Sequence, residues 1–101
     1  MTLNEQHEIL SRFAEVGIVA GNRVRFTQEI ERYPLGIIKP GETGTIVDVT
    51  GAGFVAVELD HPHPGFEDWD NELHFNYDTI PEHIDELKTL QILTEEMPEV
   101  G

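Results

Sequence analysis

The chain of 101 residues lacks cysteine and is poor in basic residues, with six Lys and Arg against twenty Asp and Glu. Without cysteine it can have no disulfide framework, no thiol nucleophile and no zinc–thiolate site. So few cations cannot neutralise a nucleic-acid backbone, and the excess of acid repels anionic membrane surfaces. We therefore expect no direct binding to nucleic acid and no association with membranes.

Long apolar runs and catalytic motifs are also missing. No apolar run approaches the ~20 residues that a membrane span needs, and the segment Met1–Glu5 lacks the basic start and apolar stretch of a signal peptide. We therefore expect a cytoplasmic protein. Ser11 is the one serine and falls in a predicted helix, and the chain has no GxGxxG or phosphate-binding loop. These absences predict a non-enzymatic protein without a cofactor.

The negative charge is concentrated in the second half of the chain. Residues 1–56 contain five basic and seven acidic residues, whereas residues 57–101 contain one basic and thirteen acidic residues. The residues predicted to form an acidic binding surface are Asp68, Asp70, Glu72, Asp78, Glu82, Asp85 and Glu86. Such a surface attracts a basic partner protein and speeds its encounter. Two alternatives stay open: a nucleic-acid mimic that inhibits a DNA- or RNA-binding protein, and a coat that only keeps the protein soluble.

Periodicity predicts one helix followed by short strands. Residues 2–16 place Leu3, Ile9, Leu10, Phe13 and Val16 on one helical face. This stripe can dock on the domain or join two copies of the chain into a homo-oligomer. The segments with strand character are 22–28, 43–49, 54–59, 69–77 and 87–93, the last of which also suits a helix. We interpret residues 1–20 as a helix and linker, 21–93 as a barrel and 94–101 as an acidic tail.

A short helix followed by about five short strands predicts a mainly β protein, a five-stranded barrel with an N-terminal α-helix. The segments Gly21–Phe26, Lys39–Ile46, Val55–Asp60 and Trp69–Asn71 resemble SH3-like small barrels. They are similar to KOW-type barrels, to small bacterial and phage barrel domains, and to the C-terminal barrel of the nitrile hydratase β subunit. The resemblance covers roughly residues 20–93 and implies a binding module for peptides, proteins or nucleic acid. KOW barrels that bind RNA are usually basic on the working face, and this chain is not.

Three aromatic residues are candidates for a peptide groove. Tyr33 lies in the long first loop, Phe66 lies in the second loop and Trp69 begins the next predicted strand. In SH3-like barrels, loop aromatics often line the peptide groove, and a nearby acid such as Asp68 would pair with a basic residue of the ligand. Trp69 also has an alternative interpretation as a core residue, because it shares its strand phase with Leu73 and Phe75.

Histidines next to acids suggest a metal site as a third hypothesis, in a metal-dependent enzyme or an accessory subunit. The weak candidates are His61, His63 and His74, close in sequence to Asp70 and Glu72. Imidazole and carboxylate ligands suit zinc, manganese or nickel. On one strand face, however, such residues are spaced about 7 Å apart, too far for three of them to reach one ion unaided. We therefore expect no metal.

Overall fold

The computed structural model describes residues 3–32 and 35–93. Tyr33 and the predicted acidic tail lie outside these described residues. In chain order the elements are α1 (Leu3–Glu15), β1 (Arg23–Phe26), β2 (Ile30–Arg32), β3 (Gly36–Ile38), β4 (Thr43–Val49), β5 (Val55–Leu59), the 3-10 helix η1 (Pro64–Trp69), β6 (Glu72–Phe75), α2 (Glu82–Lys88) and β7 (Leu90–Leu93).

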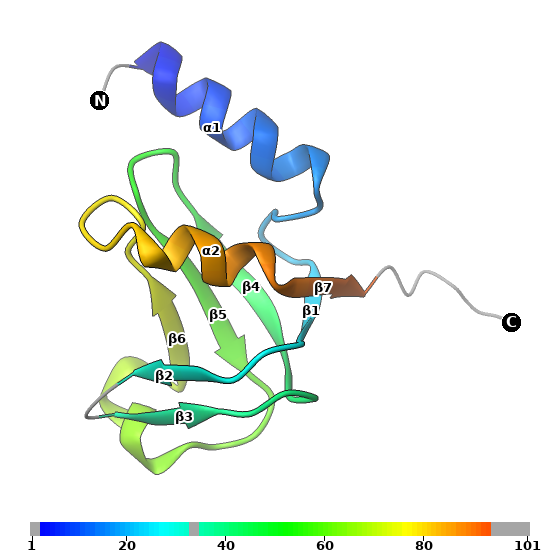
Figure 1. The fold of residues 1–101 in the computed structure, drawn as a ribbon, viewed down its shortest axis with the longest axis vertical. Coiled ribbons are helices and arrows are strands. Elements are labelled where there is room, and N and C mark those ends of the chain that lie inside the picture. Colours follow the sequence, from blue (N-terminus) through cyan, green and yellow to red (C-terminus); the bar gives the residue numbers. More distant parts are fainter. Residues whose placement is uncertain (1–2, 33–34, 94–101) are drawn as a thin grey trace, which may run out of the picture.

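Five of these strands form one antiparallel sheet in the order β6-β5-β4-β1-β7, and β2 and β3 form a separate hairpin (Figure 1). The predicted N-terminal helix and five strands are therefore confirmed. The prediction of a mainly β barrel needs correction, because two α-helices make the described fold mixed α/β and the sheet is not closed. β6 and β7 are its two edges, and α2 connects them in the chain.

The core lies on one face of the curled sheet and beneath the β2–β3 hairpin. Alternation buries Val24 and Phe26 of β1 completely and leaves Arg25 exposed. The pleat causes this pattern, because successive side chains of a strand point to opposite faces. In β4 the register shifts between Ile46 and Asp48, and the extra residue Val47 is 40% exposed. Such a bulge bends its strand and increases the twist of the sheet.

The hairpin β2–β3 occupies a segment that the sequence analysis assigned to a loop. Ile30 pairs with Ile38, and both side chains are at most 1% exposed. Figure 1 shows the hairpin running across the lower part of the main sheet. Burial of these two isoleucines against the core explains why so short a pair of strands is stable, since an isolated hairpin is marginal in water.

The predicted strand 69–77 is shorter than expected and begins later. Trp69 is the last residue of η1, and β6 begins only at Glu72. Asp70 and Asn71 both have a φ of 58°, in the left-handed region, so the extended conformation cannot begin before them. Trp69 is therefore not part of the strand, so its phase relative to Leu73 and Phe75 does not place it in the core. The interpretation of Trp69 as a core residue is wrong, because Trp69 is 48% exposed.

An ion pair connects the start of β1 to the residue that follows β5. Both guanidinium nitrogens Nη1 and Nη2 of Arg23 donate to the Asp60 carboxylate, at 2.7 and 2.6 Å. The hydroxyl of Thr43 donates to the same carboxylate. The Arg23 and Thr43 hydrogen bonds lower the pKa of Asp60 from 3.8 to about 2. This carboxylate therefore stays charged throughout the range in which histidines titrate.

The sequence predicts the packing of the two ends of the described chain only in part. Of the predicted strand 87–93, residues 90–93 form a strand beside β1, whereas Leu87 and Lys88 belong to α2. In α1, Phe13 is 8% exposed and meets Tyr77 edge to face, whereas Leu3 at the start of the helix and Val16 directly after its end are 71% and 61% exposed. The apolar stripe of α1 is thus only partly docked on the domain. None of the described helices has the length and apolar character needed to cross a membrane.

Candidate functional site

A pocket of about 450 Å³ lies among η1, β6, α2 and the β2–β3 hairpin. We call it the Trp69 pocket. Its lining includes the aromatic residues Phe66 and Trp69 and the acidic residues Glu31, Glu72, Glu82 and Glu86. Residues far apart in the sequence therefore form a single concave surface that combines an aromatic ring with carboxylates.

Trp69 is the accessible aromatic group of this pocket. Its ring meets the His74 ring edge to face, with 5.4 Å between the centroids, and Phe54 meets His74 from another direction at 5.0 Å. Nε2 of His74 lies 3.0 Å from Oε1 of Glu72. Phe66 is 1% exposed and belongs to the core, so it supports the pocket from beneath. The indole of Trp69 is consequently held in place and remains half exposed.

Arg32 bridges two walls of the pocket. Its Nη1 and Nη2 donate to both carboxylate oxygens of Glu86, at 3.1 and 2.6 Å, and Nε and Nη2 donate to the carbonyl oxygen of His74 at 3.2 and 3.1 Å. The guanidinium also lies 5.2 Å from the centre of the Phe75 ring. With its side chain only 13% exposed, Arg32 is engaged by the protein itself. It therefore links β2, β6 and α2 and neutralises one of the four acids.

His83 is the buried titratable residue of the lining, at 7% exposure. Its Nδ1 accepts a hydrogen bond from the backbone N–H of Asn76 at 2.8 Å, so in the neutral ring the proton is on Nε2. Burial and the nearby positive charge of Arg32 lower the pKa of His83, although Glu86 and Glu82 oppose this effect. His83 is thus a neutral residue that joins α2 to the end of β6.

Backbone contact sets the distance between η1 and the hairpin. Gly65 of η1 lies directly against the backbone of Leu35, and a Cβ atom at this position would overlap the Leu35 carbonyl oxygen. Leu35 and the η1 residues Phe66 and Trp69 line the same pocket. A glycine is required here because no other residue lets two backbones approach so closely.

The structure brings together some of the predicted site residues and separates others. Glu72, Glu82 and Glu86 line the Trp69 pocket with Phe66 and Trp69. The predicted acids outside this lining are all exposed: Asp68, Asp70, Asp78 and Asp85. Tyr33, the third predicted aromatic, lies outside the described residues. The predicted acidic surface thus divides into a part that lines a pocket and a part that lies on the outer surface.

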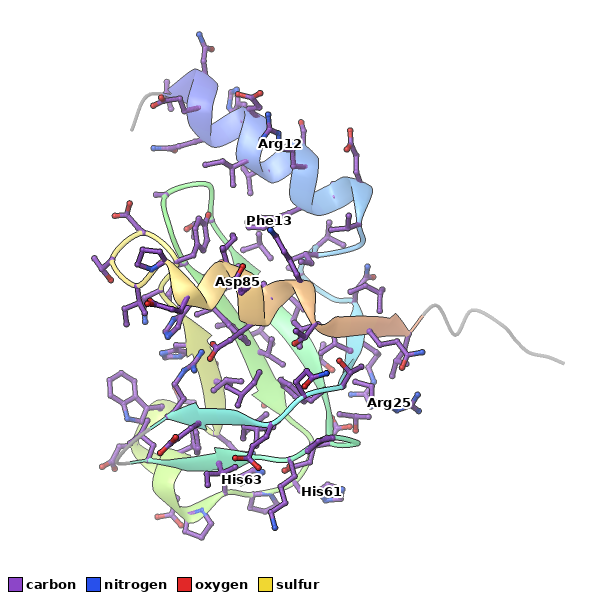
Figure 2. The ribbon with its side chains drawn as sticks, viewed as in Figure 1. Arg12, Phe13, Arg25, His61, His63 and Asp85 are labelled. Carbon is purple, nitrogen blue, oxygen red and sulfur yellow. The ribbon has the colours of Figure 1, made fainter. Side chains whose placement is uncertain are left out.

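The histidines proposed as metal ligands do not converge. His63 Nε2 lies 2.6 Å from Oε1 of Glu42, and His74 pairs separately with Glu72. Burial favours the protonated form of Glu42, but the N–H of Lys39 and the His63 ring outweigh it and hold the Glu42 pKa below its usual value. Figure 2 shows His61 and His63 at the end of the molecule away from α1. Within residues 3–32 and 35–93, no group of three or more His, Asp or Glu side chains is arranged to hold a metal ion.

Comparison of the chain with protein-family models, with curated proteins and with solved structures finds no match.

Sequence analysis missed Arg32, His83 and Glu31 as residues of this site. Arg32 meets Glu86, which is 54 positions away in the chain, and no local pattern indicates such a pair. His83 lies in a short acidic helix that shows no binding motif. Only the charge and aromatic content of residues 66–86 pointed to this region.

Proposed function

We propose that this chain is a non-enzymatic binding module that engages a basic partner protein through an acidic surface centred on the Trp69 pocket. The observation that carries the proposal is a half-exposed indole in a pocket lined by four carboxylates, of which only Glu86 is neutralised by an arginine of the chain itself. A Lys or Arg side chain entering this pocket would meet the indole ring as a cation–π partner. It would also form charge-assisted hydrogen bonds with Glu31, Glu72 or Glu82.

We propose further that the fold has an SH3-like arrangement in which the five-stranded sheet stays open and α2 connects its two edge strands in the chain. The strand order β6-β5-β4-β1-β7 supports this, because it is the order of an SH3-like barrel when the β2–β3 hairpin is counted as the long first loop. The resemblance implies that loop aromatics and neighbouring acids form the peptide site. Trp69 and Glu72 line one pocket with Glu31 and Arg32 of the hairpin that stands for the long first loop, which supports this assignment.

The proposal can be tested with a short synthetic peptide that has a central arginine between two lysines. Trp69 is the one tryptophan of the chain, so its fluorescence reports directly on the pocket. We expect a saturable fluorescence change whose midpoint shifts to higher peptide concentration as salt rises from about 50 to 200 mM, because screening weakens exposed charge pairs. Binding that ignores salt, or no fluorescence change, would contradict the proposal.

A matched pair of variants separates the pocket from overall charge. Glu82→Gln removes one negative charge from the pocket lining, and Asp48→Asn removes one from an exposed position on β4 outside it. We expect Glu82→Gln to weaken peptide binding several-fold and Asp48→Asn to leave it nearly unchanged. Equal weakening by both variants would show that the peptide responds to net charge alone.

Nucleic-acid mimicry makes a different prediction for Trp69. A mimic needs correctly spaced carboxylates but no aromatic ring. Calorimetry with Trp69→Ala should therefore show about tenfold weaker binding of the basic peptide if the pocket is the site, which corresponds to about 1.4 kcal/mol. The mimicry hypothesis is favoured if the Trp69→Ala variant binds the basic peptide normally and a triple variant does not. That triple variant carries Asp68→Asn, Asp70→Asn and Glu72→Gln.

A further inference from the structure

A second hollow, of about 530 Å³, lies among α1, α2 and β7. We call it the α1–α2 groove. Its wall is largely apolar and includes Ile9 of α1, Val16 directly after α1, Ile84 of α2 and Ile92 of β7. Phe13 lies on the side of α1 that faces α2 (Figure 2), and it lines the groove together with Tyr77, whose ring it meets edge to face. The volume is within the range of about 300–1,000 Å³ that is typical of small-molecule sites.

The charge of this groove is opposite to that of the protein as a whole. Two of the six basic residues of the chain, Arg12 and Lys88, line it, and no Asp or Glu of the described residues does. Lys88 is exposed in the last turn of α2, and Arg12 forms a surface pair with Glu8 at 2.8 Å. An exposed pair of this kind contributes little energy, so Arg12 can turn to another anion at small cost.

We propose that the α1–α2 groove binds an amphipathic monoanion, a long-chain carboxylate whose alkyl chain lies along the apolar wall and whose carboxylate meets Lys88 and Arg12. An apolar wall with a few polar groups at one position is the usual composition of a site for such a ligand. The net charge of −14 disfavours an acidic protein or a second copy of the chain as the occupant, because each would bring many like charges close together. A small ligand with a single negative charge meets far less repulsion.

The test is a calorimetric titration of the full chain with dodecanoate below its micellar concentration. Dodecanol and dodecyltrimethylammonium provide the same alkyl chain with no charge and with a positive charge. We expect one dodecanoate per chain, bound about tenfold more tightly than dodecanol, because a charge-assisted hydrogen bond contributes about that factor. The cationic ligand should bind most weakly, because it meets Lys88 and Arg12.

Substitutions at exposed positions locate the ligand without endangering the fold. The double variant Arg12→Gln, Lys88→Gln should lose the preference for dodecanoate over dodecanol, whereas Lys39→Gln, an exposed lysine outside the groove, should keep it. Val16→Glu places a charge in the wall at a residue that is 61% exposed, and it should abolish binding of both ligands.

Three results would overturn the proposal. The first is the absence of saturable dodecanoate binding, and the second is equally tight binding of dodecyltrimethylammonium. The third is self-association of the chain, measured by sedimentation, that is abolished by Val16→Glu and is not reduced by dodecanoate. The groove would then be an interface between two copies. Peptide binding at the Trp69 pocket is measured independently of all three results.

Discussion

The Trp69 pocket and the α1–α2 groove have similar volumes, about 450 and 530 Å³, and opposite linings. The pocket combines four carboxylates with a half-exposed indole, whereas the groove combines apolar side chains with two cations. The formal net charge of −14 would predict the same preference for cations everywhere on the molecule. The comparison teaches that the residues lining each hollow, and not the net charge, determine which ligand it favours.

The two hollows also differ in how their walls are held. Arg32 connects three elements around the Trp69 pocket, and Gly65 adds a direct backbone contact. One wall of the groove is α1, whose main anchors are Phe13 and Ile9 against the core and a close approach of Gln6 to Gly51. We therefore expect that separating α1 from the domain costs less free energy than separating the walls of the Trp69 pocket from one another.

The largest expected effect comes from removing the anchor of α1. Phe13→Ala should lower the free energy of unfolding by about 3 kcal/mol, because a buried phenyl ring is lost and a cavity remains. It should also abolish dodecanoate binding while leaving basic-peptide binding intact. Urea denaturation and the two titrations measure these effects. The exposed neighbour Val16, changed to Ala, should alter stability by less than about 0.5 kcal/mol.

The independence of the two hollows depends on this prediction. If Phe13→Ala also removed peptide binding at the Trp69 pocket, the walls of the pocket and the groove would be coupled, and the contrast drawn above would be wrong.

A smaller effect is expected from breaking the link between the pocket walls. Arg32→Met should cost about 2 kcal/mol, because it leaves the Glu86 carboxylate half-buried and without its guanidinium partner. Adding Glu86→Gln should restore part of the loss, since the unpaired charge is then removed. A double-mutant cycle by urea denaturation measures the coupling. If the stability changes of the two substitutions simply add, the role assigned to this pair is contradicted. Dodecanoate binding should change in neither variant.

The smallest effect is a pH dependence that arises from His83. Its pKa is lowered in the folded state, so the unfolded chain takes up the proton first as the pH falls below about 6.5. The stability linked to His83 is therefore complete above that pH and decreases below it. His83→Gln keeps an acceptor for the Asn76 N–H but does not titrate, so its stability should change less between pH 7 and pH 5.

Between pH 5 and pH 7, the effect of His83 on stability is separate from that of the Arg23–Asp60 ion pair. Asp60, with its pKa of about 2, stays ionised throughout this range and contributes no slope. Identical pH profiles for the native chain and His83→Gln would contradict the buried, neutral state of this histidine.

The sequence predicted the features that depend on local pattern. Alternation located β1, β-branched residues located β4, and a glycine-rich turn located the start of β5. Helical periodicity located α1. All four signals reflect the geometry of a short stretch of chain. The prediction failed where two adjacent residues interrupt the pattern. Asp70 and Asn71 adopt left-handed conformations, which ends η1 and delays β6, although this dipeptide is a recognisable signal for that geometry.

The candidate site was predictable only in its composition. The acid-rich segment and the aromatic residues Phe66 and Trp69 drew attention to the right region, and three of the predicted acids do line the pocket. The arrangement itself depends on partners distant in the chain, such as Arg32 with Glu86 and Gly65 with Leu35. Such pairs follow from topology, and one sequence contains no local pattern that reveals them.

The contact between Gly65 and Leu35 has a consequence for how this pocket can be altered. Because two backbones touch there and Arg32 connects the other walls, the separation of the walls does not depend on the exposed acids around the opening. Glu31 and Glu82 are exposed on the rim of this opening, so they can be exchanged for other residues while the opening keeps its dimensions. Ligand preference can therefore be redesigned, or can diverge in evolution, by changing rim chemistry alone on a frame of constant size.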